Sequence, residues 1–254
     1  MFFDTHAHVN DKRFDEDREA FIKSLSDYNV SNFVEVAYDI KSSYDAVSLA
    51  ERFDAVYAAV GVHPSDVDGI IDGDMDVLSH LLSRDKVVAL GEIGLDYHWD
   101  DAPQRELQKE WFVRQIDVAK EADMPIIVHT RDAMEDTINI LKDTVVSDGI
   151  IHCFSGSVES ARILLNMGFY ISFAGPVTFK NARGLLDVAR FVPDDRLLIE
   201  TDSPYLCPEP NRGKRNCPGY VGLVCERIAA VRGIEVEELA QITTNNAKTV
   251  YRIK

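Results

Sequence analysis

Short runs of apolar, often β-branched residues recur along the chain, and polar stretches separate them. Val, Ile, Phe and Tyr favour strands because their side chains pack well on a pleated surface. A run of four to eight apolar residues bounded by turn residues is typical of a buried strand. Eight such runs predict strands at residues 2–6, 32–37, 55–61, 87–94, 124–130, 149–154, 169–173 and 196–202.

Amphipathic stretches lie between most of these predicted strands. Their apolar residues recur every three or four positions, which is the spacing of the buried face of a helix. They predict helices at residues 17–28, 41–53, 106–123, 132–143, 157–168 and 181–192, and two closing helices at 220–232 and 236–250.

Strands that alternate with helices form βαβ units, whose strands run parallel. Eight units in 254 residues are what a (β/α)8 TIM barrel requires. We therefore expect an α/β protein with a single barrel domain over residues 1–254. A doubly wound open sheet is the competing architecture, but no Gly-x-Gly-x-x-Gly sequence follows the first predicted strand.

The formal net charge of −16 argues against a broad cationic surface for nucleic acid. A polyanionic substrate would have to be met locally, by metal ions and a few placed cations. No apolar run is long enough to cross a bilayer, and the first residues lack the pattern of a signal peptide. The sequence therefore predicts a cytoplasmic protein that is not associated with a membrane.

Residues that can bind metal ions gather at the carboxyl ends of the predicted strands. In a barrel these ends converge on one face, where the active sites of this fold lie. Five of the seven histidines of the chain fall there, and burying them without a metal ion or another partner would be costly. The residues at these ends are His6, His8, His63, Glu92, His129, His152 and Asp202.

Six of these side chains, four imidazoles and two carboxylates, are too many for one tetrahedral zinc ion. The pattern predicts two divalent ions, with His6, His8 and Asp202 on one and His129 and His152 on the other. Glu92 would bridge the two ions. Mixed nitrogen and oxygen ligands suit Mg²⁺, Mn²⁺, Zn²⁺ or Co²⁺ and do not select among them.

A pair of divalent ions predicts hydrolytic chemistry. Two adjacent ions can polarise an ester or phosphoryl oxygen and activate a water molecule. Asp202 would orient that water and accept its proton. The chain shows no pattern for a flavin, haem or nicotinamide site, so hydrolysis is favoured over redox chemistry.

The ordered motifs D-T-H-A-H, G-V-H-P, G-E-I-G-L-D-Y, H-T-R, H-C-F-S-G and E-T-D-S-P-Y-L resemble those of the TatD family of metal-dependent deoxyribonucleases. That family belongs to the amidohydrolase superfamily, and the resemblance covers essentially the whole chain. It implies a TIM barrel, a divalent metal centre and removal of nucleotides from the 3′ end of DNA, most readily single-stranded DNA. It assigns the six side chains above as metal ligands, and Asp202, Glu92 and His63 as catalytic residues. In this assignment His63 contacts the phosphate or donates a proton and does not bind metal.

The resemblance extends to the loop P-E-P-N-R-G-K-R-N-C-P, in which Cys217 stands where the family commonly has glutamate. We expect Arg212 and Lys214 to contact substrate phosphate, although Lys214 and Arg215 fit a solvated loop equally well.

Ser155 and Gly156 are expected to open the helix after the sixth strand, where their N–H groups could meet a phosphate. Asp4 is expected to support the metal-binding histidines, and Glu200 either supports the site or has an ordinary structural role. Tyr205 could stack on a base, but core packing is favoured for it, and Trp99 is assigned to structure.

Two other functions remain open from the sequence. The same metal centre could cleave a carboxylic ester, as in a D-aminoacyl-tRNA deacylase, and the product would discriminate between the two reactions. A metal-binding scaffold without catalysis is disfavoured because Glu92 and Asp202 are both present. We expect a monomer without a stable protein partner, because a closed barrel has no free sheet edge.

Overall fold

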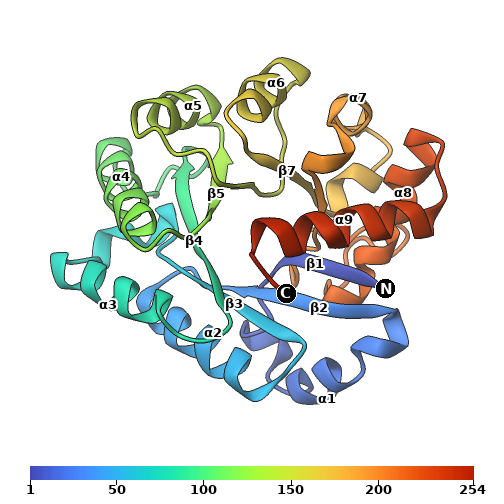
Figure 1. Cartoon of the computed structure of the whole chain (residues 1–254), viewed down its shortest axis with the longest axis horizontal. Helices are drawn as coiled ribbons and strands as arrows, with labels where there is room; N and C mark the ends of the chain where they lie inside the picture. Colours follow the sequence, from blue (N-terminus) through green and yellow to red (C-terminus); the bar gives the residue numbers. More distant parts are fainter.

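The computed structural model describes residues 1–254 and arranges eight parallel strands into a barrel (Figure 1). Each strand pairs with the next one along the chain, from the first to the eighth. The strands are β1 (Phe2–Ala7), β2 (Val30–Val36), β3 (Val56–Val60), β4 (Val87–Asp96), β5 (Ile126–Arg131), β6 (Gly149–Ile151), β7 (Tyr170–Phe173) and β8 (Leu197–Ile199). The prediction of an α/β TIM barrel is confirmed.

Helices surround the sheet (Figure 1). They are α1 (Arg18–Lys23), α2 (Ile40–Arg52), α3 (Asp72–Leu82), α4 (Arg105–Glu121), α5 (Met134–Asp143), α6 (Val158–Asn166), α7 (Arg183–Phe191), α8 (Val221–Arg232) and α9 (Val236–Val250). Six short 3-10 helices join them: η1 (Lys12–Phe14), η2 (Leu25–Tyr28), η3 (Pro64–Gly69), η4 (Gly175–Thr178), η5 (Asp194–Arg196) and η6 (Pro218–Tyr220). The helix expected at residues 17–28 divides into α1 and η2, and α3 was not among the predicted helices.

Two strands end earlier than their apolar runs suggested. β6 ends at Ile151 and β8 at Ile199, so the metal-binding residues expected there lie in the following loops. Cys153 and Asp202 have positive φ angles of 42° and 55°, and this left-handed backbone cannot continue a strand. The chain therefore turns where the predicted site residues begin.

Hydrogen bonds between the first strand and the segment after the last strand close the barrel. The N–H of Asp202 donates to the carbonyl of His6 at 2.9 Å, and the N–H of His8 donates to the carbonyl of Ser203 at 2.7 Å. The hydroxyl of Thr5 donates to the carbonyl of Ile199 at 3.0 Å. The first strand and the segment after the last strand thereby meet at one side of the predicted metal centre.

The last helix covers the end of the barrel at which the strands begin. An apolar cluster joins Phe3 and Leu198 to Val250 and Tyr251, at the end of α9. The hydroxyl of Tyr251 donates to the carbonyl of Thr5 at 2.7 Å. Figure 1 shows α9 passing across the barrel, with both termini close together. The opposite end, where the strands finish, is left for the site. None of the helices combines the length and apolar character needed to cross a bilayer.

Candidate metal centre

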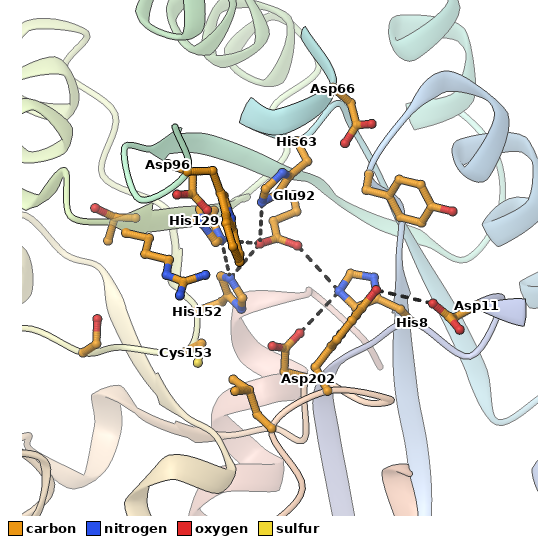
Figure 2. Close-up of a pocket in the computed structure, with 17 residues that line it drawn as sticks. His8, Asp11, His63, Asp66, Glu92, Asp96, His129, His152, Cys153 and Asp202 are labelled. Carbon is orange, nitrogen blue, oxygen red and sulfur yellow. Dashed lines mark hydrogen bonds and ion pairs between the residues drawn. The ribbon is translucent and has the colours of Figure 1, made fainter. Parts of the chain in front are cut away.

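Side chains from strands on all sides of the barrel meet around one pocket of about 610 Å³ (Figure 2). Six of the seven predicted site residues line it, and the seventh, His6, is fully buried beside them. His6 lies near the end of β1 and His8 directly follows it, whereas Glu92 comes from β4 and His129 from β5. The remaining residues follow β3, β6 and β8, and they are His63, His152 and Asp202. The structure therefore brings together all seven side chains that the sequence placed at strand ends.

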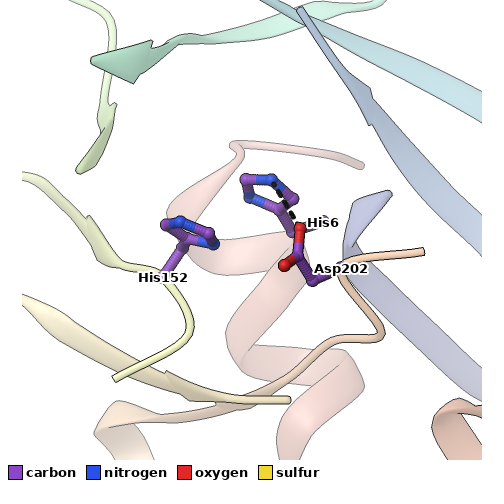
Figure 3. Close-up of side chains that lie close together, drawn as sticks. All are labelled: His6, His152 and Asp202. Atoms are coloured by element: carbon purple, nitrogen blue, oxygen red, sulfur yellow. Dashed lines mark ion pairs between the residues drawn. The ribbon is translucent and has the colours of Figure 1, made fainter. Parts of the chain in front are cut away.

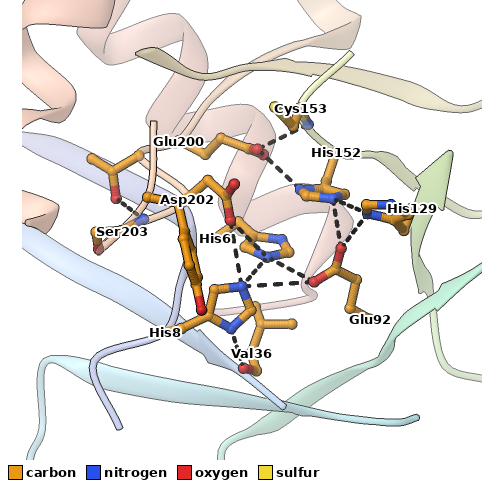
Figure 4. A network of polar contacts seen from close by, with 12 residues as sticks. His6, His8, Val36, Glu92, His129, His152, Cys153, Glu200, Asp202 and Ser203 are labelled. Atoms are coloured by element: carbon orange, nitrogen blue, oxygen red, sulfur yellow. Dashed lines mark hydrogen bonds and ion pairs between the residues drawn. The ribbon is translucent and has the colours of Figure 1, made fainter. Parts of the chain in front are cut away.

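Glu92 lies between two pairs of histidines, and its two oxygens face different pairs (Figure 4). Oε2 is 3.3 Å from Nε2 of His6 and 3.6 Å from Nε2 of His8. Oε1 is 2.7 Å from Nδ1 of His129 and 2.7 Å from Nε2 of His152. Only 5 % of the Glu92 side chain is exposed, so protein groups surround this carboxylate in place of most of its water.

The nitrogens within each histidine pair also face one another. Nε2 of His6 is 3.1 Å from Nε2 of His8, and Nδ1 of His129 is 3.2 Å from Nε2 of His152. Metal–ligand bonds of about 2.1 Å at tetrahedral or octahedral angles separate neighbouring ligand atoms by roughly 3.0–3.4 Å. The spacing of the donor atoms therefore fits divalent ions.

Asp202 completes the cluster on the side of β1. Its Oδ1 is 3.4 Å from Nε2 of His8 and 3.8 Å from Nε2 of His6. Figure 3 shows this carboxylate beside His6 and His152, whose rings stack with centroids 4.1 Å apart. His6, His152 and Asp202 form one of four groups of donor atoms that could hold an ion.

Two of the histidines are oriented by oxygen atoms behind their rings. Nδ1 of His8 is 2.8 Å from the carbonyl of Val36. Nδ1 of His152 is 3.2 Å from Oε1 of Glu200, which also accepts the N–H of Cys153 at 2.8 Å. Such partners fix which ring nitrogen faces the ion. Of the two roles that the sequence left open for Glu200, these contacts favour support of His152.

Asp96 supports His129, a role that was not predicted from the sequence. Its Oδ2 is 3.1 Å from Nε2 of His129. His63, Asp96 and His129 form another of the donor groups that could hold an ion. The sequence did contain a signal for Asp96. It lies four residues after Glu92 in the same strand, and side chains at even spacing along a strand point to the same face.

Asp4 contacts His6 through the backbone and not through the imidazole ring. Its carboxylate accepts the N–H of His6 at 3.2 Å, the N–H of Thr201 at 2.9 Å and the hydroxyl of Thr201 at 2.5 Å. Nδ1 of His6 is buried without a hydrogen-bond partner. Asp4 therefore joins β1 to the segment after β8 and sets the position of His6.

A second buried carboxylate holds the turn that follows His8. Glu35 accepts the N–H of Val9 at 2.7 Å and the N–H of Asn10 at 3.0 Å. The guanidinium of Arg18 donates to the carbonyl of Val9 at 2.8 Å from the other side. Burial raises the pKa of Glu35 to about 7, against the lowering effect of these hydrogen bonds.

A glycine allows β4 and β5 to lie close together at the site. Gly94 has a φ of +142°, and a Cβ placed on it would be 2.0 Å from the carbonyl oxygen of His129. No other residue fits this approach. Gly94 thereby allows Glu92 and His129, on neighbouring strands, to meet.

The charges of the centre stabilise one another. Burial raises the pKa of Glu92, but the charge of His152 and the hydrogen bond with His129 outweigh burial and hold it well below its ordinary value. Burial lowers the pKa of His8, yet the hydrogen bond to Asp202 and the carboxylate charges raise it to about 9. Carboxylates that stabilise a protonated imidazole stabilise a bound cation in the same way.

His63 is held in one neutral form. Burial and the charge of His129 lower its pKa to about 3. Its Nδ1 accepts the N–H of Ser65 at 3.1 Å, so the proton of the neutral ring is on Nε2. That Nε2 lies 3.7 Å from Oε1 of Glu92, and His63 lines the pocket. His63 therefore presents a hydrogen-bond donor to the site.

The residues expected to bind substrate separate into two groups. Ser155 lines the pocket, although α6 begins only at Val158, so Ser155 does not open the helix as predicted. Arg212 and Lys214 do not line it: the guanidinium of Arg212 packs 4.3 Å above the ring of Phe179, and Lys214 is exposed. The structure does not bring this basic run to the wall of the pocket.

Two aromatic residues lie elsewhere than the sequence suggested. Trp99 was assigned to structure, but it is 54 % exposed and lines the pocket. Tyr205, for which core packing was favoured, is 47 % exposed and also lines the pocket. Arg131 lines the pocket too and had no assigned role.

The chain resembles known proteins over its whole length. Residues 3–252 match the family model described as TatD related DNase. The chain is 48 % identical over 255 residues to the uncharacterized metal-dependent hydrolase YabD of Bacillus subtilis, with all of both chains covered. It is 41 % identical over 256 residues to the uncharacterized metal-dependent hydrolase YcfH of Escherichia coli K12, covering 98 % of this chain and 95 % of the relative.

A solved structure agrees with these sequence matches. The crystal structure of YJJV, a TatD homologue from Escherichia coli K12, superposes with a TM-score of 0.94 at 32 % identity. The superposition covers 100 % of this chain and 98 % of that one. The barrel and all its strand-end residues therefore lie within the matched region.

Proposed function

The chain belongs to the TatD family of metal-dependent hydrolases, and on this premise we propose that it removes nucleotides from the 3′ end of DNA. The reaction would be hydrolysis of the terminal phosphodiester bond, with two divalent ions at the strand-end cluster. The family model that matches the chain is described as a DNase, which supports a phosphodiester substrate.

The position of Glu92 carries the proposal. Its two oxygens face two separate histidine pairs, at 2.7 to 3.6 Å. A carboxylate in this position can be shared by two cations. We assign His6, His8 and Asp202 to one ion, His129 and His152 to the other, and Glu92 to both. Bound divalent ions supply polarisation of the phosphoryl oxygen and a lowered pKa of the attacking water.

Asp202 is suited to accept a proton from the attacking water. Burial raises its pKa, but the hydrogen bond to His8 and the charges of His6 and His152 lower it below the ordinary value. The carboxylate is therefore ionised at neutral pH, and it lines the pocket. A general base must lie within hydrogen-bond reach of the proton it abstracts, and a water bound in this pocket beside Asp202 would satisfy that condition.

His63 is suited to bind the phosphoryl group. Its neutral ring presents Nε2–H to the pocket on the side of Glu92 Oε1. A fixed donor directed at the place where negative charge develops stabilises a transition state without reorganisation. We assign His63 to the phosphoryl oxygen on the side of the site opposite Asp202.

The experiment uses metal-stripped protein with Mg²⁺, Mn²⁺ or Zn²⁺ restored, and single-stranded DNA labelled at the 5′ or the 3′ end. We expect a ladder of shortened 5′-labelled products and early release of 3′-labelled mononucleotide. Asp202→Asn should abolish both while the variant stays folded. Asp117→Asn, on the exposed side of α4, is the matched control and should retain full activity.

Other products would identify other reactions. Cleavage at internal positions would replace the 3′ exonuclease assignment with an endonuclease. No cleavage of DNA, together with release of free amino acid from D-aminoacyl-tRNA, would overturn the nuclease and favour a deacylase that uses the same centre.

A further inference from the structure

The mouth of the pocket carries three exposed aromatic side chains. Trp99 is 54 % exposed, Tyr205 47 % and Tyr38 41 %, and all three line the pocket. Large aromatic side chains are buried on average, and an exposed group of them at a cavity marks a binding surface. Trp111, the only other tryptophan, is 6 % exposed.

Two of these aromatic rings are each stacked against an arginine. The guanidinium of Arg131 lies 5.0 Å from the ring centroid of Trp99, and that of Arg13 lies 4.2 Å from the ring centroid of Tyr205. Trp99 and Arg131 come from the loop after β4 and the end of β5. Tyr205 and Arg13 follow β8 and β1. In a barrel ordered β1 to β8, these positions lie on opposite sides of the metal centre.

The two arginines differ in their charge partners. Nε of Arg13 is 2.9 Å from a carboxylate oxygen of Asp11, so its charge is already balanced. Arg131 makes no ion pair. It is also the only lysine or arginine among the residues that line the pocket, whereas five of them are acidic. Arg131 is therefore the one cation at the pocket whose guanidinium is free for an anionic ligand.

From these observations we infer that Trp99 and Arg131 form a binding site for one unpaired nucleotide at the mouth of the pocket. Trp99 stacks on the base, and Arg131 binds the phosphate that follows it. The inference rests on the proposed function, because it takes the substrate to be nucleic acid. Stacking needs a base whose face is open, so the site selects single strands over paired ends. Arg131 thus takes the role of phosphate contact that the sequence predicted for Arg212 and Lys214.

The test measures binding of single-stranded DNA whose 3′ linkages are phosphorothioates, which prevents turnover. Trp99→Ala should weaken binding roughly 5- to 150-fold, as expected for loss of one stacked base, and Trp99→Phe should restore part of it. Arg131→Gln should lower the slope of log affinity against log salt by about 0.7, the value for one phosphate contact on a single strand. Trp99→Ala should leave that slope unchanged.

Matched controls separate this site from general effects. Arg105 stacks on Tyr97 at 4.3 Å without an ion pair and away from the pocket, so Arg105→Gln should bind like the wild type. Tyr44 is 51 % exposed and does not line the pocket, so Tyr44→Ala should also bind normally.

Fluorescence gives a second readout that does not depend on activity. Titration with single-stranded DNA should quench the emission of exposed Trp99, and the Trp99→Phe variant should lose the quenching because Trp111 is buried. Unchanged DNA affinity in both Trp99→Ala and Arg131→Gln, from a wild type that cleaves DNA, would overturn this site and leave the proposed function standing. A wild type that neither binds nor cleaves DNA would overturn both.

Discussion

The carboxylate of Asp96 lies 3.1 Å from Nε2 of His129, on the far side of the ring from the Nδ1 atom that faces Glu92. His129 is the one histidine of the cluster that presents Nδ1 to the centre; His6, His8 and His152 present Nε2. Asp96 thus fixes the proton of His129 on Nε2 and leaves Nδ1 free to bind metal.

Changing Asp96 should weaken metal binding without unfolding the protein. Asp96→Asn keeps an acceptor but loses the charge, so we expect about tenfold weaker affinity, and Asp96→Ala should approach a hundredfold. Isothermal titration of the metal-stripped protein measures this. Asp132→Asn, at an exposed carboxylate that contacts His98, is the control. Equal affinities in Asp96→Ala and the control would show that Asp96 does not act on the ligand.

Removing the metal should lower the melting temperature. A ligand at a hundred times its Kd stabilises the folded state by about 2.7 kcal/mol, which corresponds to roughly 5–10 °C in a chain of this size. Thermal unfolding with and without a chelator measures the shift. His8→Ala should remove most of it, whereas His80→Ala, at an exposed position on α3, should retain it. A shift that survives in His8→Ala would place the stabilising ion elsewhere.

His63 should contribute to the rate as a neutral donor. We expect His63→Ala to lower kcat about 10²-fold, the usual effect of losing one donor to a developing negative charge. Because the pKa of His63 is held at about 3, the ratio of wild-type to variant kcat should stay constant from pH 5 to 8. A ratio that changes near pH 6.5 would mean that the ring acts in its protonated form.

Glu35 should make stability fall as pH rises. Its pKa is about 7 in the folded protein and 4.5 as an ordinary glutamate, so the folded state binds more protons between these values. The unfolding free energy therefore decreases as pH rises through that window. Relative to Glu35→Gln, the wild type should lose on the order of 2–3 kcal/mol between pH 4.5 and 8.

Chemical unfolding of the metal-free protein at several pH values checks this prediction. Glu121→Gln, at an exposed residue at the end of α4, serves as the control and should follow the wild type. Parallel curves for wild type and Glu35→Gln would show that Glu35 is ionised in the folded state across the whole window.

The sequence was sufficient to predict the barrel and to place the candidate metal-binding residues in one site. Strong apolar runs located the eight strands, and the donors stood directly at the end of those runs. Because parallel strands in a barrel share one carboxyl end, residues as distant in sequence as His6 and Asp202 could be placed in one site.

Positions set by loops were not predictable in the same way. Arg212 packs on Phe179 and Trp99 lies open at the mouth because of how long connections fold over the barrel. No local spacing encodes those packings. Alternation along β4 places Asp96 on the same face as Glu92, but its contact with His129 also depends on the close approach of β4 and β5 at Gly94.

The hydrogen bonds from Asp202 to His6 and from His8 to Ser203 have a consequence for how the protein is made. The ribosome synthesises His6 and His8 first, and about two hundred residues follow before it reaches Asp202. A nascent chain that stops short of β8 carries most of the metal donors but no closed barrel to hold them. The proposed ions would therefore find their full set of ligands only in a chain whose synthesis has passed β8.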